Sequence, residues 1–83
     1  MEKINVWRIA IEDNKIIVYP EEGKARVFSR DKVNAYIDAR EVKQIQVFKD
    51  YTLILPEEPY FCEVDEAHNR LFCGKEPEKV MIL

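Results

Sequence analysis

Apolar and polar residues alternate through the first part of the chain. The stretch from Ile4 to Ile11 alternates residue by residue, which predicts a β-strand. The two expected faces carry different residues: Trp7, Ile9 and Ile11 on one, and Arg8 and Ala10 on the other. A second alternating run, from Lys15 to Tyr19, predicts a second strand.

A tight turn is expected between these two strands. Asp13 and Asn14 tolerate the backbone conformations that short hairpin loops require. A two-residue loop at these positions sets the following residues opposite each other: Ile11 and Ile16, and Ile9 and Val18. All four then lie on one face, so the register and the apolar pattern agree on a β-hairpin.

A second turn is expected at residues 20–23, and the period of the pattern changes further along the chain, at residues 30–40. A third strand is expected from Lys24 to Ser29. Within residues 30–40, Val33, Tyr36 and Ile37 have the spacing of one helical face, which predicts an α-helix. The ends of this segment carry residues that suit helix termini: Ser29 or Asp31 as the N-terminal cap, and Arg40 at the C-terminal end.

Strands are expected again in the second half of the chain. Two runs flank Lys49-Asp50, a stiff connector follows at residues 56–59, and a hairpin is expected from Tyr60 to Cys73. A last short strand is expected from Val80 to Leu83. Residues 1–83 are therefore predicted to form a single compact α+β domain. It has a mostly antiparallel, curved sheet of about 6–8 short strands and one α-helix, at about 30–40, packed on a face.

The two cysteines fall opposite each other in the last expected hairpin. A loop centred between Ala67 and His68 pairs Cys62 with Cys73, at a separation that suits a disulfide. Because no feature indicates secretion and cytosolic thiols stay reduced, two buried free thiols are the preferred interpretation and a disulfide is the alternative. Zinc is not expected, since Cys62, His68 and Cys73 supply only three ligands.

Composition places the chain among folded proteins that do not cross a membrane. Of its 83 residues, 47% are hydrophobic and 35% are charged, with a net charge of −3. No apolar run approaches the length of a membrane span, and the N-terminus has no signal-peptide pattern. A cytoplasmic protein without membrane contact is expected.

Few residues offer catalytic chemistry. The two glycines, Gly23 and Gly74, are too far apart in the sequence to form a phosphate-binding loop. Ser29 and His68 are the only serine and histidine, and Ser29 is interpreted as a cap rather than a nucleophile. We therefore expect no enzymatic activity, no catalytic residue, no metal and no cofactor.

Binding to another protein is the preferred hypothesis for function. The C-terminal third combines aromatic residues with acids that can steer and hold a basic partner surface. The candidate contact residues are Glu57, Glu58, Tyr60, Phe61, Glu63, Asp65 and Glu66. The chain has the general size and character of small phage or mobile-element inhibitors that occlude host nucleic-acid machines, although no shared motif identifies a family. A regulator or inhibitor of this kind is expected.

Direct nucleic-acid binding is the alternative hypothesis. Residues 24–49 hold seven basic and three acidic residues, whereas residues 50–83 hold three basic and eight acidic residues. The candidate phosphate contacts in the basic segment 24–43 are Lys24, Arg26, Arg30, Lys32, Arg40 and Lys43. The acidic remainder makes nucleic acid the less favoured partner. A homodimer is a further possibility, because an apolar end such as Val80 to Leu83 can pair with a second copy.

Overall fold

Eight β-strands make up nearly all of the fold. The computed structural model describes residues 2–38, 40, 42–57 and 60–74. Its elements are β1 (Glu2–Glu12), β2 (Lys15–Pro20), β3 (Arg26–Ser29), β4 (Asn34–Ile37), β5 (Val42–Val47), β6 (Tyr51–Pro56), β7 (Phe61–Asp65), the short 3₁₀ helix η2 (Glu66–His68) and β8 (Arg70–Cys73). Across these residues there is no α-helix, so the expected α+β class is wrong and the fold is nearly all β. The final strand expected at Val80 to Leu83 lies outside the described residues.

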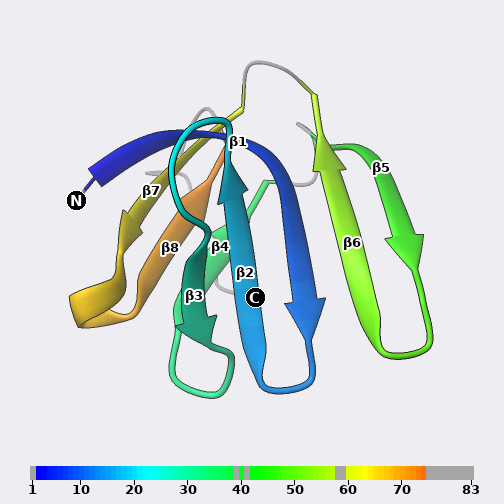
Figure 1. Cartoon of the computed structure of the whole chain (residues 1–83), viewed down its shortest axis with the longest axis horizontal. Coiled ribbons are helices and arrows are strands. Elements are labelled where there is room, and N and C mark those ends of the chain that lie inside the picture. Colours follow the sequence, from blue (N-terminus) through cyan, green and yellow to red (C-terminus); the bar gives the residue numbers. More distant parts are fainter. Residues whose placement is uncertain (1, 39, 41, 58–59, 75–83) are drawn as a thin grey trace.

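The long strand β1 connects two sheets because its two halves have different neighbours. Its N-terminal half pairs with β7, whereas its C-terminal half lies between β2 and β6. The front sheet has the order β3-β2-β1-β6-β5, and the back sheet has the order β1-β7-β8-β4. Figure 1 shows the front sheet nearest the viewer, with β8 and β4 passing behind it. The sheet is mixed, because β4 and β8 run parallel while the other pairs are antiparallel.

A β-bulge interrupts β1 at Trp7. The register between β1 and β2 shifts by one residue between Val6 and Arg8. Because the extra residue resets the alternation, Val6 and Ile9 both face the core, while Trp7 is 45% exposed. The expectation that Trp7 shares a face with Ile9 is therefore wrong.

The hydrophobic core lies between the two sheets and draws on nearly every strand. Its buried members are Val6, Ile9, Ile16, Val18, Phe28, Ala35, Ile37, Ile54, Tyr60, Cys62, Val64, Leu71 and Cys73. On most strands these residues alternate with residues that point away from the core. The front sheet therefore has a second face, which the back sheet does not cover.

The segment expected to form a helix at about 30–40 instead contains a turn and the strand β4. The amides of Lys32 and Val33 donate to the carbonyl of Ser29, which closes one turn, and the chain then becomes extended. Ala35 and Ile37 alternate into the core and pair with β8. Three apolar positions at helical spacing were weak evidence for a helix. Asparagine, aromatic and β-branched residues are poor helix formers, and pairing with β8 favours the strand.

Two hairpins have the register that the sequence predicts. The structure contains the expected opposite pairs: Ile11 with Ile16, Ile9 with Val18, and Cys62 with Cys73. Cys62 and Cys73 form a disulfide across β7 and β8, with their Cα atoms 4.0 Å apart. The preferred interpretation of two free thiols is therefore wrong, and the alternative of a disulfide is correct.

Candidate functional site

The acidic and aromatic residues expected to contact a basic partner are not gathered into one surface. Tyr60 is 0% exposed and belongs to the core. Phe61 is half-buried, and the Nζ atom of Lys3 lies 4.9 Å from its ring centroid. Glu63 is half-buried opposite Lys3 on the neighbouring strand. Glu57 is exposed directly after β6, and Glu58 lies outside the described residues.

Asp65 and Glu66, from the same predicted group, are engaged within the chain. An oxygen of Asp65 accepts a hydrogen bond from the His68 amide, and its other oxygen lies 2.8 Å from Nδ1 of His68. Hydrogen bonding to His68 holds the pKa of Asp65 below its ordinary value. Glu66 Oε1 lies 2.7 Å from Nη1 of Arg26. Both carboxylates are thus paired with groups of the same chain at the β7–β8 end of the fold.

Three arginines from the alternative nucleic-acid hypothesis are also held by groups of this chain. Arg26 bridges Glu66 and Glu2, and the hydrogen bond from Arg26 lowers the pKa of Glu2. Arg30 donates to the carbonyl of Glu12, and Arg40 donates to the carboxylate of Asp38. The three lysines of this group, Lys24, Lys32 and Lys43, are exposed on three different segments. No continuous basic track results among the described residues.

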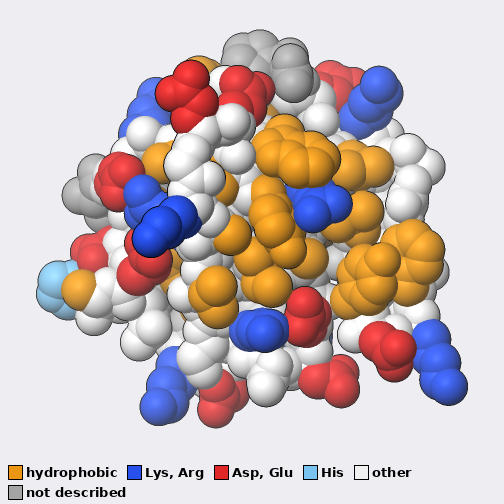
Figure 2. Space-filling view, viewed as in Figure 1, with side chains coloured by type: hydrophobic (Ala, Val, Ile, Leu, Met, Phe, Trp, Pro, Cys, Tyr) orange, Lys and Arg blue, Asp and Glu red, His pale blue; other side chains and the backbone are white. Residues whose placement is uncertain are grey.

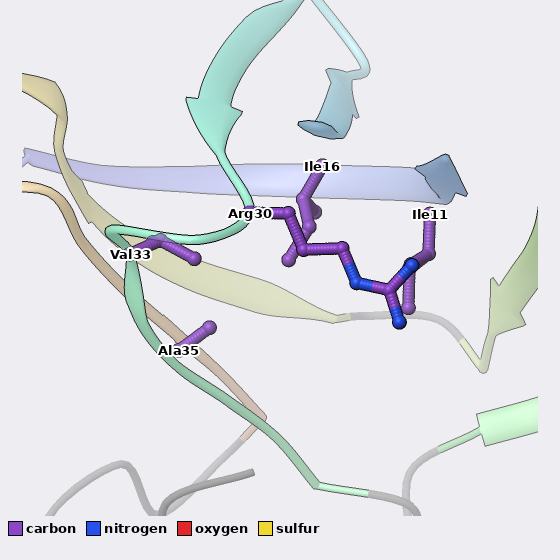
Figure 3. A pocket seen from close by; sticks show the side chains of 5 residues that line it. All are labelled: Ile11, Ile16, Arg30, Val33 and Ala35. Atoms are coloured by element: carbon purple, nitrogen blue, oxygen red, sulfur yellow. The ribbon is translucent and has the colours of Figure 1, made fainter. Parts of the chain in front are cut away.

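A pocket of about 220 Å³ opens at one end of the core, between the β1–β2 hairpin and β4. Figure 3 shows the side chains that line it: Ile11, Ile16, Arg30, Val33 and Ala35. Four of these five side chains are apolar, and the fifth, Arg30, already donates to the carbonyl of Glu12 at 2.9 Å. These lining residues include no acid and no nucleophile, so we assign no chemistry to the pocket.

The outer side of the front sheet carries an apolar row that crosses four strands. Val27 lies opposite Ile17, Ile17 lies opposite Ala10, and Ala10 lies opposite Leu53. Directly opposite residues share a face, and none of these four belongs to the core cluster, although Ala10 is only 6% exposed. Figure 2 shows this side, with apolar side chains gathered over β2, β1 and β6 and a basic side chain in their midst.

Trp7, Arg8 and Tyr19 form a cluster on this side of the sheet. The guanidinium carbon of Arg8 lies 4.5 Å from the ring centroid of Trp7 and 4.2 Å from that of Tyr19. The two ring centroids are 6.3 Å apart. The bulge makes this cluster possible, because without it consecutive residues such as Trp7 and Arg8 point to opposite faces.

Two more aromatic residues extend the apolar surface to the tip of the β5–β6 hairpin. The rings of Phe48 and Tyr51 are stacked with centroids 4.8 Å apart. Tyr51 alternates with Leu53 and Leu55 along β6, so all three share a face. We call the whole surface the outer apolar face, and it comprises Trp7, Arg8, Ala10, Ile17, Tyr19, Val27, Phe48, Tyr51, Leu53 and Leu55.

Sequence reasoning missed this face, although two strands carried a signal for it. Residues 15–19 and 51–55 contain consecutive apolar residues, so apolar side chains fall on both sides of each strand. A strand with two apolar faces is typical of a sheet that is covered on both sides. The back sheet covers one side, and the outer apolar face is the other.

Comparisons with known proteins found no similar protein, so a function has to be argued from the fold and its surface. Searches against protein-family models, curated proteins and solved structures returned no match. Within the described ranges, no helix is long and apolar enough to cross a membrane. In the same part of the chain, no group of three or more His, Cys, Asp or Glu residues is placed to hold a metal ion.

Proposed function

We propose that the protein is a non-enzymatic protein-interaction module that binds its partner through the outer apolar face. The observation that carries this proposal is the row from Val27 to Leu53, in which Val27 is exposed, Ile17 and Leu53 are half-buried and Ala10 is buried, together with exposed Trp7 beside it. Contiguous exposed apolar surface on a small protein is typical of an interaction site. Tryptophan, tyrosine and arginine are also the residues that most often dominate binding energy at interfaces.

The acidic residues support partner binding less well than the outer apolar face does. Tyr60 lies in the core, and Asp65 and Glu66 are already bound to groups of the chain. A module that holds its partner by an apolar face can still act as a regulator or inhibitor, because it occludes the surface that it covers. We therefore propose a regulator or inhibitor whose contact surface is the outer side of the front sheet.

A pair of identical substitutions on opposite sides of the front sheet tests this proposal. Val27 is 52% exposed on the outer apolar face, whereas Val47 is 77% exposed and shares a face with Ile45, which lies opposite core residue Ile54. Tagged wild type, Val27→Lys and Val47→Lys are used to capture proteins from lysate of the source cells, with and without nuclease treatment. Captured proteins are quantified by mass spectrometry, and circular dichroism confirms that each variant is folded.

The proposal expects a partner that is recovered with wild type and Val47→Lys and lost with Val27→Lys. Equal recovery with all three proteins would show that the outer apolar face is not the binding surface. A Glu63→Lys variant tests the basic-partner hypothesis. Loss of the partner with this variant alone would show that the acidic residues, and not the outer apolar face, bind the partner. Binding that disappears with nuclease would identify nucleic acid as the ligand instead.

A further inference from the structure

Arg8 occupies an unusual position for a charged residue, because it lies among apolar and aromatic side chains. Its guanidinium packs on Trp7 and Tyr19, and its strand neighbours on the same side are Ala10 and Tyr19. The Nε atom of Arg8 is buried and has no hydrogen-bond partner among the described residues. An Arg stacked on aromatic rings keeps its full charge, so this position holds a fixed cation within an apolar surface.

Three other arginines differ from Arg8 in their partners. Arg26 contacts two carboxylates, Arg40 donates twice to one carboxylate, and Arg30 donates to a main-chain carbonyl. In the part of the chain that the structure describes, Arg8 has ring contacts and no carboxylate or carbonyl at hydrogen-bond distance. Arg26, Arg30 and Arg40 thus have structural roles, and Arg70 is exposed on β8. The donors of Arg8 other than the buried Nε are left for a group outside the described fold.

We propose that Arg8 is the receptor for a carboxylate of the bound partner, an Asp or Glu side chain set in an apolar segment. This inference rests on the proposed function and names the chemistry that the partner brings to the outer apolar face. Covering Arg8 with a purely apolar surface would remove its charge from water without compensation, which is unfavourable. A planar guanidinium forms its strongest hydrogen bonds with a carboxylate, and the two rings fix its orientation.

A carboxylate fits this site better than a nucleic-acid backbone does. A phosphate chain needs several cations along its path, and the outer apolar face offers Arg8 among apolar neighbours. A charged pair on the same side lies at the end of the β1–β2 hairpin, where Lys15 Nζ is 3.8 Å from Oε1 of Glu12. The surroundings of Arg8 are therefore suited to one anionic group within an apolar contact.

Two small probes of equal shape test the inference on the full chain. ¹⁵N-labelled protein is titrated at low ionic strength with 3-phenylpropionate and with its neutral amide, 3-phenylpropanamide. The Nε–H signal of Arg8 and the indole N–H signal of Trp7 report binding at this site. We expect the carboxylate to bind about tenfold more tightly than the amide, which corresponds to about 1.4 kcal/mol. Arg8→Gln should abolish this preference, and Arg8→Lys should retain only part of it.

The outcomes separate this inference from the proposed function. Equal affinity for the two probes, or no perturbation of Arg8 and Trp7 by either, would overturn the inference, even if partner capture depends on Val27. A second outcome is a carboxylate preference at Arg8 with partner capture that is unchanged by Val27→Lys. It would support the assignment of Arg8 as a carboxylate receptor and overturn the proposed function. A third probe, a short oligothymidylate, should leave both signals unchanged. Perturbation by this probe and by neither small molecule would assign the site to nucleic acid.

Discussion

Gly74 packs so closely against Asp38 that a Cβ atom added to Gly74 would lie 2.5 Å from the Cβ of Asp38. The two residues follow the parallel strands β8 and β4, at the point where the Asp38 amide donates to the carbonyl of Cys73. Gly74 also donates to the carbonyl of Phe61, so one glycine joins three strands of the back sheet. Its φ of +126° is a conformation that other residues rarely adopt.

Gly74→Ala is predicted to destabilise the fold strongly, because the methyl group meets both a close neighbour and an unfavourable backbone angle. Gly23→Ala is the matched control, since Gly23 also has a positive φ, of +90°, but has nothing within 4 Å of the added Cβ. We expect a loss of more than about 2 kcal/mol at Gly74 and about 1 kcal/mol at Gly23 in urea unfolding. Equal losses would mean that the contact with Asp38 can relax.

Asp38 gives the fold a predicted sensitivity to acid. Its side chain is 4% exposed, and Arg40 donates to it from Nε, Nη2 and its main-chain amide, which holds the pKa of Asp38 below its ordinary value. A group whose pKa is lowered by folding adds stability above its unfolded pKa, and this contribution is lost as the pH falls through the folded pKa. The stability of the wild type should therefore decrease below about pH 4.

Asp38→Asn removes this contribution and should therefore flatten the acid part of the stability curve. At neutral pH the variant is expected to lose about 1 kcal/mol, since it weakens charged hydrogen bonds that solvent already screens around the exposed Arg40. Urea midpoints measured across the acidic range check both expectations. Asp13→Asn, at an exposed position in the β1–β2 turn, is the control. An unchanged acid slope in Asp38→Asn would contradict the assignment.

The sequence was sufficient where local pattern and geometry carried the same information. The turn at Asp13-Asn14 and the two-residue alternation predict the β1–β2 register, and a loop centred between Ala67 and His68 predicts that of β7 and β8. It was insufficient where a distant strand decides the outcome. Residues 34–37 become a strand because β8 offers a parallel edge, and no local pattern reveals that edge.

The candidate site was missed for a related reason. A bulge at Trp7 resets the alternation of β1, and simple period counting placed this residue with the core. The acidic residues of the C-terminal third are dense in the sequence, but Asp65 and Glu66 have partners that come from η2 and from β3. Ion pairs between residues forty positions apart do not follow from composition.

The disulfide between Cys62 and Cys73 is predicted to add about 3 kcal/mol to stability, because it closes a short loop in the unfolded chain. Adding a reductant should lower the urea midpoint of the wild type by a corresponding amount. The double variant Cys62→Ala with Cys73→Ala should be insensitive to the reductant. A thiol assay on unfolded, unreduced protein should find no free thiol, and detection of two thiols would contradict the disulfide.

Val27 and Phe28 are neighbours on β3, and their substitution separates the core from the outer apolar face. Phe28 is 1% exposed, so Phe28→Ala should cost about 3–5 kcal/mol in the free energy of unfolding. Val27→Thr should change it by less than about 0.5 kcal/mol, because the side chain is 52% exposed in the free protein. If the outer apolar face binds a partner, this same mild substitution should weaken partner capture while leaving stability intact. A large loss of stability with Val27→Thr would show instead that the face is packed within the free protein, which would remove the basis for the interaction surface.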